Sequence, residues 1–378
     1  MSLKILCCGH IVRYPLGGFC WHHLQYLVGL KRLGHDVVFM EHYGWENSCY
    51  NPENDQMSGD ASYGVKFLES LLSQHGLQGR WCYLAENGTA HGMSRDELQQ
   101  FCREADLCLN LSNINSTQEM SLCRRSALVD TDPVFTQIGA VGMSQSFADY
   151  DVLFTYGQNV HKPTCRMPTA GMQWIGTRQP VVLDLWPLEA GSPSESYTSV
   201  TNWSAYGDHS FEGVTYGQKD REFERFVDLP ARSGSSFRLA LSADESVKDR
   251  LRQAGWFIVN ALEVSRDPAG YQKFIRHSKG EWCVAKHGYV VARSGWFSDR
   301  SAGYLASGRP VILQDTCFSQ WLPCGQGLFQ FSTMDDALAA VRKVNEDYPA
   351  HCRAARKIAE EHFDSDQVLT RMLEVAIS

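Results

Sequence analysis

The chain has 378 residues, of which 43% are hydrophobic and 21% are charged. That length exceeds what one hydrophobic core usually serves, so we expect two α/β domains. The formal net charge of -8 argues against a general affinity for nucleic acid, because neutralising phosphates needs a basic surface. The sequence lacks an apolar run of roughly 18 residues, so we expect no transmembrane segment.

The cysteines and the N-terminus indicate the cellular compartment in which the protein is found. The 13 cysteines are scattered, without C-x-x-C pairs or histidines at zinc spacing. The apolar stretch within residues 1–9 is too short for the core of a signal peptide. We therefore expect reduced, buried thiols in a cytoplasmic protein.

Strands and helices alternate along the N-terminal part of the chain. The predicted strands cover residues 3–9, 36–41, 107–111, 127–129 and 152–156, and the predicted helices include 19–33 and 94–103. The first three elements form a βαβ unit, because strand, helix and strand follow one another with short connections. This alternation predicts a parallel, doubly wound sheet.

A second series of strands follows a segment rich in proline, glycine and serine. That segment has linker composition, and we place the domain boundary there. The later predicted strands cover residues 198–203, 237–241, 256–259, 281–285 and 310–313. From Ser332 onward the pattern is almost entirely helical, and Asp364 is the expected N-cap of a last helix over 367–376. The chain thus predicts two Rossmann-like halves.

Residues 293–312 are the most informative segment, and they indicate a loop, a helix, a tight turn and a strand. Gly295 would let the backbone approach a ligand, and Ser298 or Asp299 can cap the helix. The N–H groups of the first helical turn, at the positive end of the helix dipole, would form an anion site. A diphosphate would fit such a site.

Both ends of the chain resemble one enzyme family. The runs GYLASGRPVILQDT, LPCGQGLFQFSTMDDALAAV and AARKIAEEHFDSDQVL resemble the donor-domain end of GT-B glycosyltransferases, especially family 4. The run YPLGGFCWHHLQYLVGLKRLGHDVVFME resembles the other end of that pattern. The resemblance implies two Rossmann-like domains facing a cleft, with C-terminal helices packing back toward the N-terminal domain. It implies an acceptor domain in residues 1–165, a linker in 166–197, an NDP-sugar domain in 198–360 and a crossover helix in 361–378.

The donor loop departs from the family pattern. Family 4 enzymes usually carry two glutamates eight positions apart, and aligning on the Gly-Arg-Pro turn places Gly295 and Gly303 there. The full retaining mechanism therefore cannot be transferred, and we expect a GT-B enzyme with a divergent donor loop. In this loop Arg300 could hold a phosphate through two hydrogen bonds, and Trp296 or Phe297 could stack on a base or sugar. Alternatively, Trp296 is a core residue and Arg300 a surface salt-bridge partner.

A second donor-binding candidate is Lys219, at the start of the helix after the first strand of the C-terminal half. A fixed cation there would stabilise the negative charge that develops on a leaving NDP. Alternatively, Lys219 is a solvated lysine on an amphipathic helix. Lys286 points to the same crevice by topology, and Gly17 and Gly18 could contact the phosphates from across the cleft. The residues expected around the donor are Gly17, Gly18, Asn202, Trp203, Lys219, Lys286, Gly295, Trp296, Phe297, Ser298, Asp299 and Arg300.

Two pairs of side chains compete for the role of the base that takes the proton of the acceptor hydroxyl. His22 or His23 could do so because an imidazole titrates near neutrality, although a helix-borne histidine beside a tryptophan is more often structural. Asp130 and Asp132 follow a strand that ends at the same sheet edge. The sequence leaves the choice between the pairs open.

The sequence as a whole predicts a hexosyltransferase-like enzyme that moves a sugar from a UDP- or TDP-sugar to a hydroxyl of a small molecule or glycan. The Asp130-Thr-Asp132 run is followed by proline and lies in the acceptor half, so we expect no metal ion and no cofactor besides the NDP-sugar co-substrate. An NDP-sugar epimerase or hydrolase of the same fold is one alternative. A non-catalytic sugar-nucleotide-binding protein is another, because the two glutamates are missing.

Overall fold

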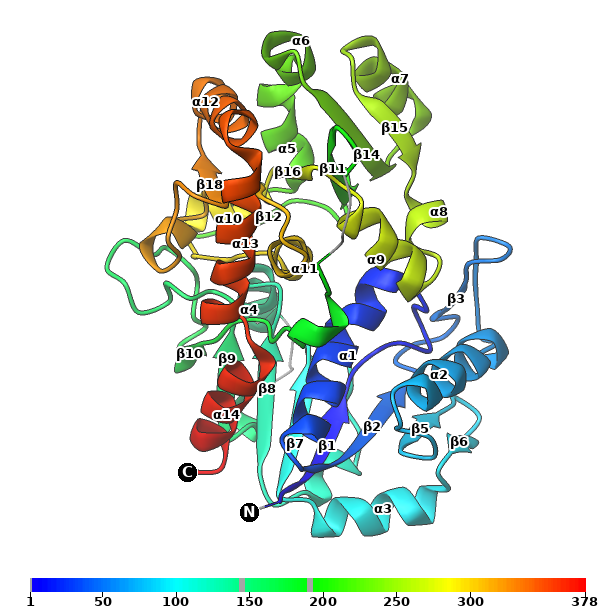
Figure 1. Ribbon diagram of the computed structural model, residues 1–378. Helices are drawn as coiled ribbons and strands as arrows, with labels where there is room; N and C mark the ends of the chain where they lie inside the picture. Colours follow the sequence, from blue (N-terminus) through cyan, green and yellow to red (C-terminus); the bar gives the residue numbers. More distant parts are fainter. Residues whose placement is uncertain (1, 143–146, 189–192) are drawn as a thin grey trace.

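The computed structural model describes residues 2–142, 147–188 and 193–378, and it consists of two α/β halves stacked end to end (Figure 1). An eight-stranded sheet forms the centre of the first half, and a six-stranded sheet forms the centre of the second. Small antiparallel hairpins accompany them, namely β3 (Cys49–Asn51) with β4 (Gln56–Ser58) and β12 (His209–Phe211) with β13 (Val214–Tyr216).

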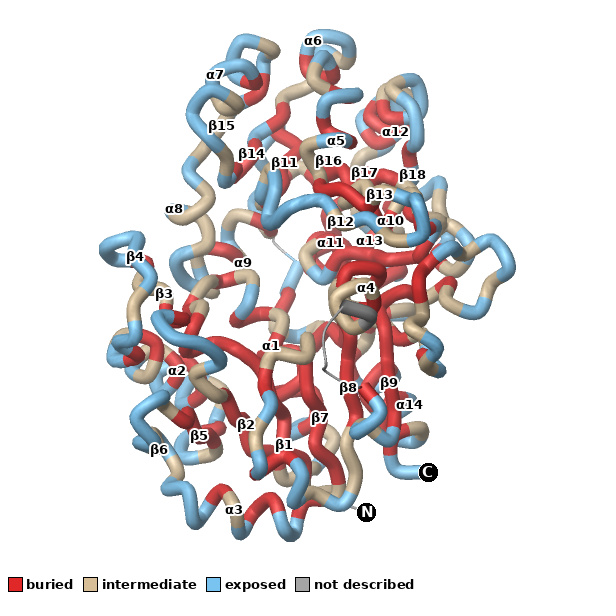
Figure 2. The backbone as a smooth tube through the Cα atoms, turned by 180° about the vertical axis from the view of Figure 1, so that it is seen from behind, coloured by how far each residue is buried: buried red, intermediate tan, exposed pale blue. Residues whose placement is uncertain are grey.

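The first sheet has the strand order β10-β9-β8-β7-β1-β2-β5-β6, and its strand pairs are parallel except β5 with β6. Its strands are β1 (Lys4–Cys8), β2 (Asp36–His42), β5 (Trp81–Leu84), β6 (Ala90–Gly92), β7 (Leu107–Leu111), β8 (Ser126–Asp130), β9 (Val152–Thr155) and β10 (Trp174–Gly176). Most of these strands are buried along their length because helices cover both faces (Figure 2). The predicted doubly wound parallel sheet is confirmed.

The second sheet has the strand order β15-β14-β11-β16-β17-β18 and is parallel throughout. Its strands are β11 (Ser196–Asn202), β14 (Ser236–Ser242), β15 (Phe257–Asn260), β16 (Gly280–Cys283), β17 (Val311–Gln314) and β18 (Leu328–Phe331). The order of strands reverses between β1 and β7 in the first sheet and between β11 and β16 in the second. Ligands of parallel α/β sheets bind at such reversals, beyond the carboxyl ends of the strands.

The helices of the first half cover its sheet. They are α1 (Gly17–Arg32), α2 (Ser62–Gln74), α3 (Arg95–Glu104) and α4 (Phe135–Gly142). The later helices are α5 (Lys219–Phe223), α6 (Leu229–Ser233), α7 (Glu245–Gln253), α8 (Ala261–Ser265), α9 (Pro268–Arg276), α10 (His287–Ala292), α11 (Asp299–Ala306), α12 (Met334–Glu346), α13 (Tyr348–His362) and α14 (Ser365–Ala376). Short 3-10 turns cover Met120–Leu122, Phe147–Asp149, Leu183–Leu185, Glu224–Phe226 and Phe318–Gln320.

The end of the chain returns to the first half. Helix α13 runs along the second half, and α14 then lies against α1 beside the first sheet (Figure 1). At the crossing, the Val181 N–H donates to the carbonyl of Phe363 at 2.7 Å, and the Ser365 N–H donates to the carbonyl of Val181 at 2.9 Å. Asp364 caps α14, because its side chain accepts the Asp366 N–H at 2.8 Å. Both the predicted return and the predicted cap are confirmed.

The boundaries of some elements differ from the sequence prediction. The predicted strand over 281–285 ends two residues earlier, and Lys286 becomes the N-cap of α10. Helix α1 begins two residues before its predicted start because it includes Gly17 and Gly18, which read as a loop. The predicted domain limits remain a prediction, and part of the expected linker, residues 189–192, lies outside the described residues.

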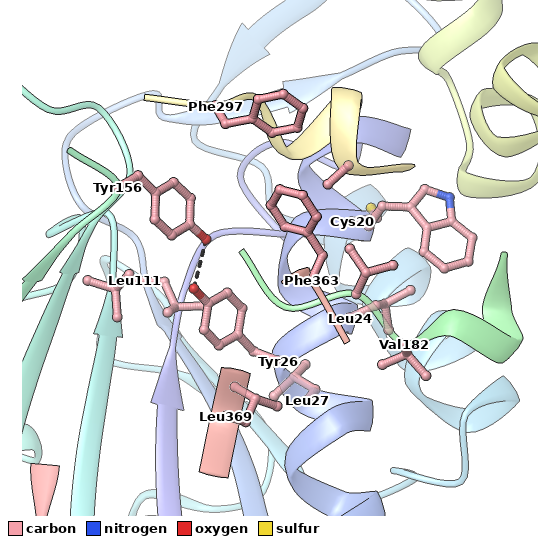
Figure 3. Packing of buried hydrophobic residues seen from close by; sticks show 14 of the residues in the cluster. Cys20, Leu24, Tyr26, Leu27, Leu111, Tyr156, Val182, Phe297, Phe363 and Leu369 are labelled. Atoms are coloured by element: carbon pink, nitrogen blue, oxygen red, sulfur yellow. Dashed lines mark hydrogen bonds between the residues drawn. The ribbon is translucent and has the colours of Figure 1, made fainter. Parts of the chain in front are cut away.

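One apolar core extends across the two halves. Leu24 and Tyr26 of α1 belong to the same cluster as Phe297 from the second half and Phe363 from the crossing segment (Figure 3). The Tyr26 and Tyr156 hydroxyls form a hydrogen bond of 2.7 Å within this cluster. Because apolar contacts continue from one half to the other, the halves are held together by packing as well as by the chain.

Candidate active site between the two sheets

A cavity of about 400 Å³ lies between the two halves, at the carboxyl ends of the strands that flank both reversals of strand order. From the first half it is lined by His10, Leu16, Gly18, Phe19, His22, Ser112, Thr131 and Tyr156. From the second half it is lined by Val200, Thr201, Asn202, Trp203, Ala205, Gln218, Lys219, Ala261, Ser265, Tyr271, Lys286, Trp296, Asp299 and Arg300. Of the predicted donor residues, those at 17, 295, 297 and 298 are not part of this lining.

The two walls of the cavity differ in charge. Among the described lining residues, the first half contributes histidines, hydroxyl groups and apolar side chains. The second half contributes Lys219, Lys286, Arg300 and Asp299. A negatively charged group entering the cavity would therefore be attracted toward the second half.

Lys219 is the first residue of α5, and its side chain is half-buried where it lines the cavity. Its Nζ donates to the hydroxyl of Thr201 at 2.8 Å, a neutral partner. The pKa of Lys219 is lowered to about 8, mainly by burial and in smaller part by the nearby Arg300 and Lys286 charges. A desolvated ammonium group with N–H bonds to spare is well suited to binding a phosphate.

Arg300 lines the cavity, and it is not the surface salt-bridge partner that the alternative prediction made it. Its Nε lies 2.5 Å from Glu281 Oε1, its Nη1 donates to the Val200 carbonyl at 2.8 Å, and its Nη2 lies 3.1 Å from Cys283 Sγ. The pair with Glu281 is buried, so it is not a surface salt bridge. These contacts use part of the N–H groups of the guanidinium and join α11 to β11 and β16. The predicted role of Arg300 in holding a phosphate stays a prediction.

Lys286 and Asp132 form an ion pair that connects the two halves. Lys286 Nζ lies 2.9 Å from each carboxylate oxygen of Asp132, and it also donates to the Tyr206 hydroxyl at 2.8 Å. The hydroxyl groups of Tyr206 and Tyr289 donate to the same carboxylate. With four donor contacts, the Asp132 carboxylate is occupied and is poorly placed to act as a base.

His23 and Asp130 are also occupied by structural contacts, and neither lines the cavity. His23 Nε2 accepts the His10 N–H at 3.1 Å, and its Nδ1 donates to the Phe19 carbonyl at 2.7 Å. Burial lowers the pKa of His23 to about 3, so it is neutral. Asp130 accepts from the side chains of Gln137 at 2.8 Å and Thr155 at 2.7 Å. Their predicted role as a base does not agree with this geometry.

His22 is the one predicted base that lines the cavity. Its Nδ1 lies 3.9 Å from Asp299 Oδ2, and its Nε2 is buried without a hydrogen-bond partner among the described residues. Burial lowers the pKa of His22, and the Asp299 charge opposes that shift. A neutral imidazole with an unused nitrogen is able to accept a proton.

The donor loop divides into residues that face the cavity and residues that face the core. Trp296 lines the cavity, and its ring lies 4.4 Å from that of Tyr289. Phe297 instead packs on Phe318 and Phe363 and is a core residue. Ser298 is the N-cap of α11 by position, although its hydroxyl makes no capping bond.

The two positions where family 4 enzymes carry glutamate have little room for a side chain. A Cβ at Gly295, where φ is +74°, would lie 2.6 Å from the Asn159 side chain. A Cβ at Gly303 would lie 3.1 Å from the Trp186 ring. The absence of both glutamates is therefore matched by the packing around these glycines.

The sequence analysis missed His10, which lines the cavity and is 4% exposed. Its Nδ1 is buried without a partner among the described residues, and its ring lies 4.8 Å from that of Phe19. The available signal was its position just after β1, at the sheet edge where ligands bind. Of the glycine pair, Gly18 lines the cavity, whereas Gly17 packs against α9.

Solved structures with the same fold cover the whole chain. An α-glucosyltransferase in complex with UDP-glucose and DNA containing an abasic site is 10% identical over 100% of both chains, with a TM-score of 0.62. AviGT4, a glycosyltransferase of avilamycin A biosynthesis, is 12% identical over 99% of this chain and 96% of its own, with a TM-score of 0.58. HepE of Anabaena, in complex with UDP and glucose, is 12% identical over 99% of both chains, with a TM-score of 0.56.

The chain therefore has the GT-B fold, and its structural neighbours are glycosyltransferases. Neither a protein-family model nor a curated protein sequence matches it. At these low identities the likeness establishes the fold, while the chemistry has to be argued from the cavity itself.

The comparison corrects one expectation drawn from net charge. Several of the α-glucosyltransferase structures contain DNA, which contradicts the prediction that the chain has no general affinity for nucleic acid. A formal charge of -8 is thus no ground for excluding this class of partner. Among the described residues, none of the helices is both long and apolar enough to span a membrane.

Proposed function

We propose that this protein is a glycosyltransferase that moves a hexose from a UDP- or TDP-sugar to an acceptor hydroxyl. The observation that carries the proposal is Lys219, a half-buried cation on one wall of a cavity placed at both reversals of strand order. The UDP bound in structures of the same fold supports a nucleotide donor in such a cavity.

The chemistry would divide between the two walls. Breaking the bond between the anomeric carbon and the phosphate oxygen leaves negative charge on the NDP, and Lys219 would stabilise that charge. The start of α11 would add the positive end of its dipole. On the other wall, His22 Nε2 would take the proton of the acceptor hydroxyl as its oxygen bonds to the anomeric carbon.

Three further features belong to this proposal. The donor loop is a divergent relative of the family 4 loop, in which buried packing at Gly295 and Gly303 replaces the two glutamates. The reaction needs no metal ion, because Lys219 and helix dipoles supply the positive charge. The enzyme acts in the cytoplasm, as its scattered cysteines suggest.

A panel of UDP- and TDP-sugars tests the proposal, with released NDP measured with and without acceptors. The acceptors are phenols, simple glycosides, an oligosaccharide and a DNA duplex with hydroxymethylated bases, since nucleic acid is again an open partner. We expect NDP release that depends on one class of acceptor and falls about 10²-fold in Lys219→Met. Lys248→Met, on the surface of α7, is the matched control.

Other outcomes would overturn the proposal. Release or isomerisation of the sugar without any acceptor would identify a hydrolase or an epimerase. Binding of a UDP- or TDP-sugar without turnover would identify a sugar-nucleotide-binding protein. Equal activity of Lys219→Met and wild type would remove Lys219 from the donor site.

A further inference from the structure

His22 and Asp299 come from opposite halves of the molecule and meet at the edge of the cavity. His22 lies on α1, and Asp299 is the first residue of α11. Both also line a smaller cavity of about 20 Å³ that adjoins the large one. The separation of 3.9 Å between His22 Nδ1 and Asp299 Oδ2 exceeds a hydrogen bond by roughly 1 Å.

The Asp299 carboxylate is oriented by its own helix. Its Oδ1 accepts the N–H of Arg300 at 2.8 Å, which leaves Oδ2 turned toward His22. The positive end of the α11 dipole stabilises the ionised carboxylate. The neighbouring Arg300 guanidinium is bound to Glu281, so it does not compete for Asp299.

Apart from Arg300, which lines both cavities and is paired with Glu281, the other ionisable groups around His22 are neutral. On its own helix these are His23 and Tyr26, and from other elements they are His10 and Tyr156. The hydroxyls of Tyr26 and Tyr156 are bonded to each other (Figure 3). On α9, Tyr271 shares the lining of both cavities with His22. Among the described residues, Asp299 thus supplies the negative charge that His22 faces.

We propose that Asp299 is a positioning residue for His22, so that the base of the transfer reaction is complete only when the two halves are held together. The inference rests on the function proposed above. In this arrangement the imidazole carries its proton on Nδ1, directed at Asp299, and turns the Nε2 lone pair to the acceptor.

The atoms balance as follows during transfer. The proton of the acceptor hydroxyl passes to His22 Nε2, and the acceptor oxygen forms the new bond to the anomeric carbon. The bond from that carbon to the donor phosphate oxygen breaks, and its electron pair leaves with the NDP. The imidazolium that results is stabilised by the Asp299 carboxylate from the other half.

The test compares Asp299→Asn with wild type by pH profile and by titration of the His22 imidazole in NMR spectra, assigned through His22→Gln. The imidazolium loses a neighbouring negative charge in the variant, so its pKa falls and the acid limb of kcat moves to lower pH. We expect kcat to fall about 10²-fold while KM for the UDP-sugar changes less than about threefold. Asp299→Glu restores part of the rate.

Asp335→Asn is the matched control, since Asp335 is an exposed carboxylate of the same half. An unchanged His22 titration and acid limb in Asp299→Asn would overturn the positioning role and leave the proposed function standing. Wild-type turnover in His22→Gln would instead overturn the base in the proposed function. A loss of UDP affinity in Asp299→Asn without a shift of the acid limb would make Asp299 a donor-binding residue only.

Discussion

Lys219 is half-buried on the wall of the cavity, and its lowered pKa makes donor binding depend on pH. Burial lowers its pKa to about 8, and the protonated form is the one that attracts a diphosphate. The affinity for UDP should therefore be constant near pH 7 and fall as the pH rises through about 8. Calorimetric titrations with UDP between about pH 7 and 9.5 measure this limb.

The Lys219→Met variant removes the group that titrates. We expect its affinity for UDP at neutral pH to be weaker by about 1.5 to 3 kcal/mol, and its affinity to show no limb near pH 8. Lys248→Met should keep both the affinity and the limb. If the UDP affinity of Lys219→Met fell by the same amount as the pH rises through about 8, a group other than Lys219 would be the one that titrates.

At the scale of residues, sequence reasoning found Lys219 but could not separate His22 from His23. Adjacent helical residues point about 100° apart, so one faces the cavity and the other the core. Which one faces the cavity depends on α9 and α11, whose residues lie more than 240 positions away in the chain. The ion pair of Arg300 could not be predicted for the same reason, because its partner Glu281 comes from strand β16.

Helices α1 and α9 approach so closely at Gly17 that only glycine fits. A Cβ there would lie 2.5 Å from Tyr271 Cβ and 2.7 Å from the backbone oxygen of Asp267. Gly17→Ala should destabilise the protein by about 1 to 3 kcal/mol, because backbone cannot move aside as a side-chain tip can. Thermal unfolding of the two proteins measures the difference.

Gly18→Ala provides the control on the same turn of α1. A Cβ at Gly18 would lie 3.6 Å from the Tyr271 ring, an ordinary van der Waals contact. The gain in helix propensity is similar for both substitutions, so the difference between them isolates the contact with α9. Equal stabilities of the two variants would contradict the close approach.

At the scale of elements, the apolar periodicity located most strands within one or two residues. It failed where a contact between distant segments decides the structure. The glycine pair read as a loop, yet it starts α1, and the close approach of α9 leaves no room for a larger side chain at Gly17. Residues 284 and 285 read as strand, yet the sheet ends at Cys283 and α10 follows.

Two features hold the halves of the molecule together, namely the shared apolar core and the ion pair between Asp132 and Lys286. Lys286 Nζ also lies 4.5 Å from the ring centroid of Tyr206, and this cation–π contact adds to the attraction that keeps Lys286 in place. A double-mutant cycle with Asp132→Asn and Lys286→Met should give a coupling energy of about 0.5 to 3 kcal/mol in chemical unfolding. We expect a coupling energy of this size because the side chains of Asp132 and Lys286 are partly buried.

The exposed pair of Arg232 and Asp335 serves as the control cycle, since both side chains lie within the second half. Its coupling should stay below about 1 kcal/mol, as is usual at a surface. If the coupling energy of Asp132 and Lys286 were no larger than that of Arg232 and Asp335, packing alone would hold the two halves together.

At the scale of the whole chain, sequence reasoning predicted two sheets, a cleft and the return of the last helices. The two sheets follow from element order, which a single sequence displays directly, whereas the facing domains and the return of the last helices were implied by the resemblance to GT-B enzymes. The pairing of Asp132 with Lys286, and of His22 with Asp299, could not be predicted, because it depends on how the two halves are oriented.

The contact between α1 and α14 has a consequence for how the protein is made. Gly29 of α1 packs against Leu369 of α14, yet α14 is synthesised more than three hundred residues after α1. At roughly 5 to 20 residues per second, the interval is on the order of 20 to 60 seconds. In the later part of that interval the first half has been synthesised but α14 has not, so the side of α1 that contacts α14 is uncovered. The folding of the first half is therefore completed after the second half has been translated, and the nascent chain is open to chaperones until then.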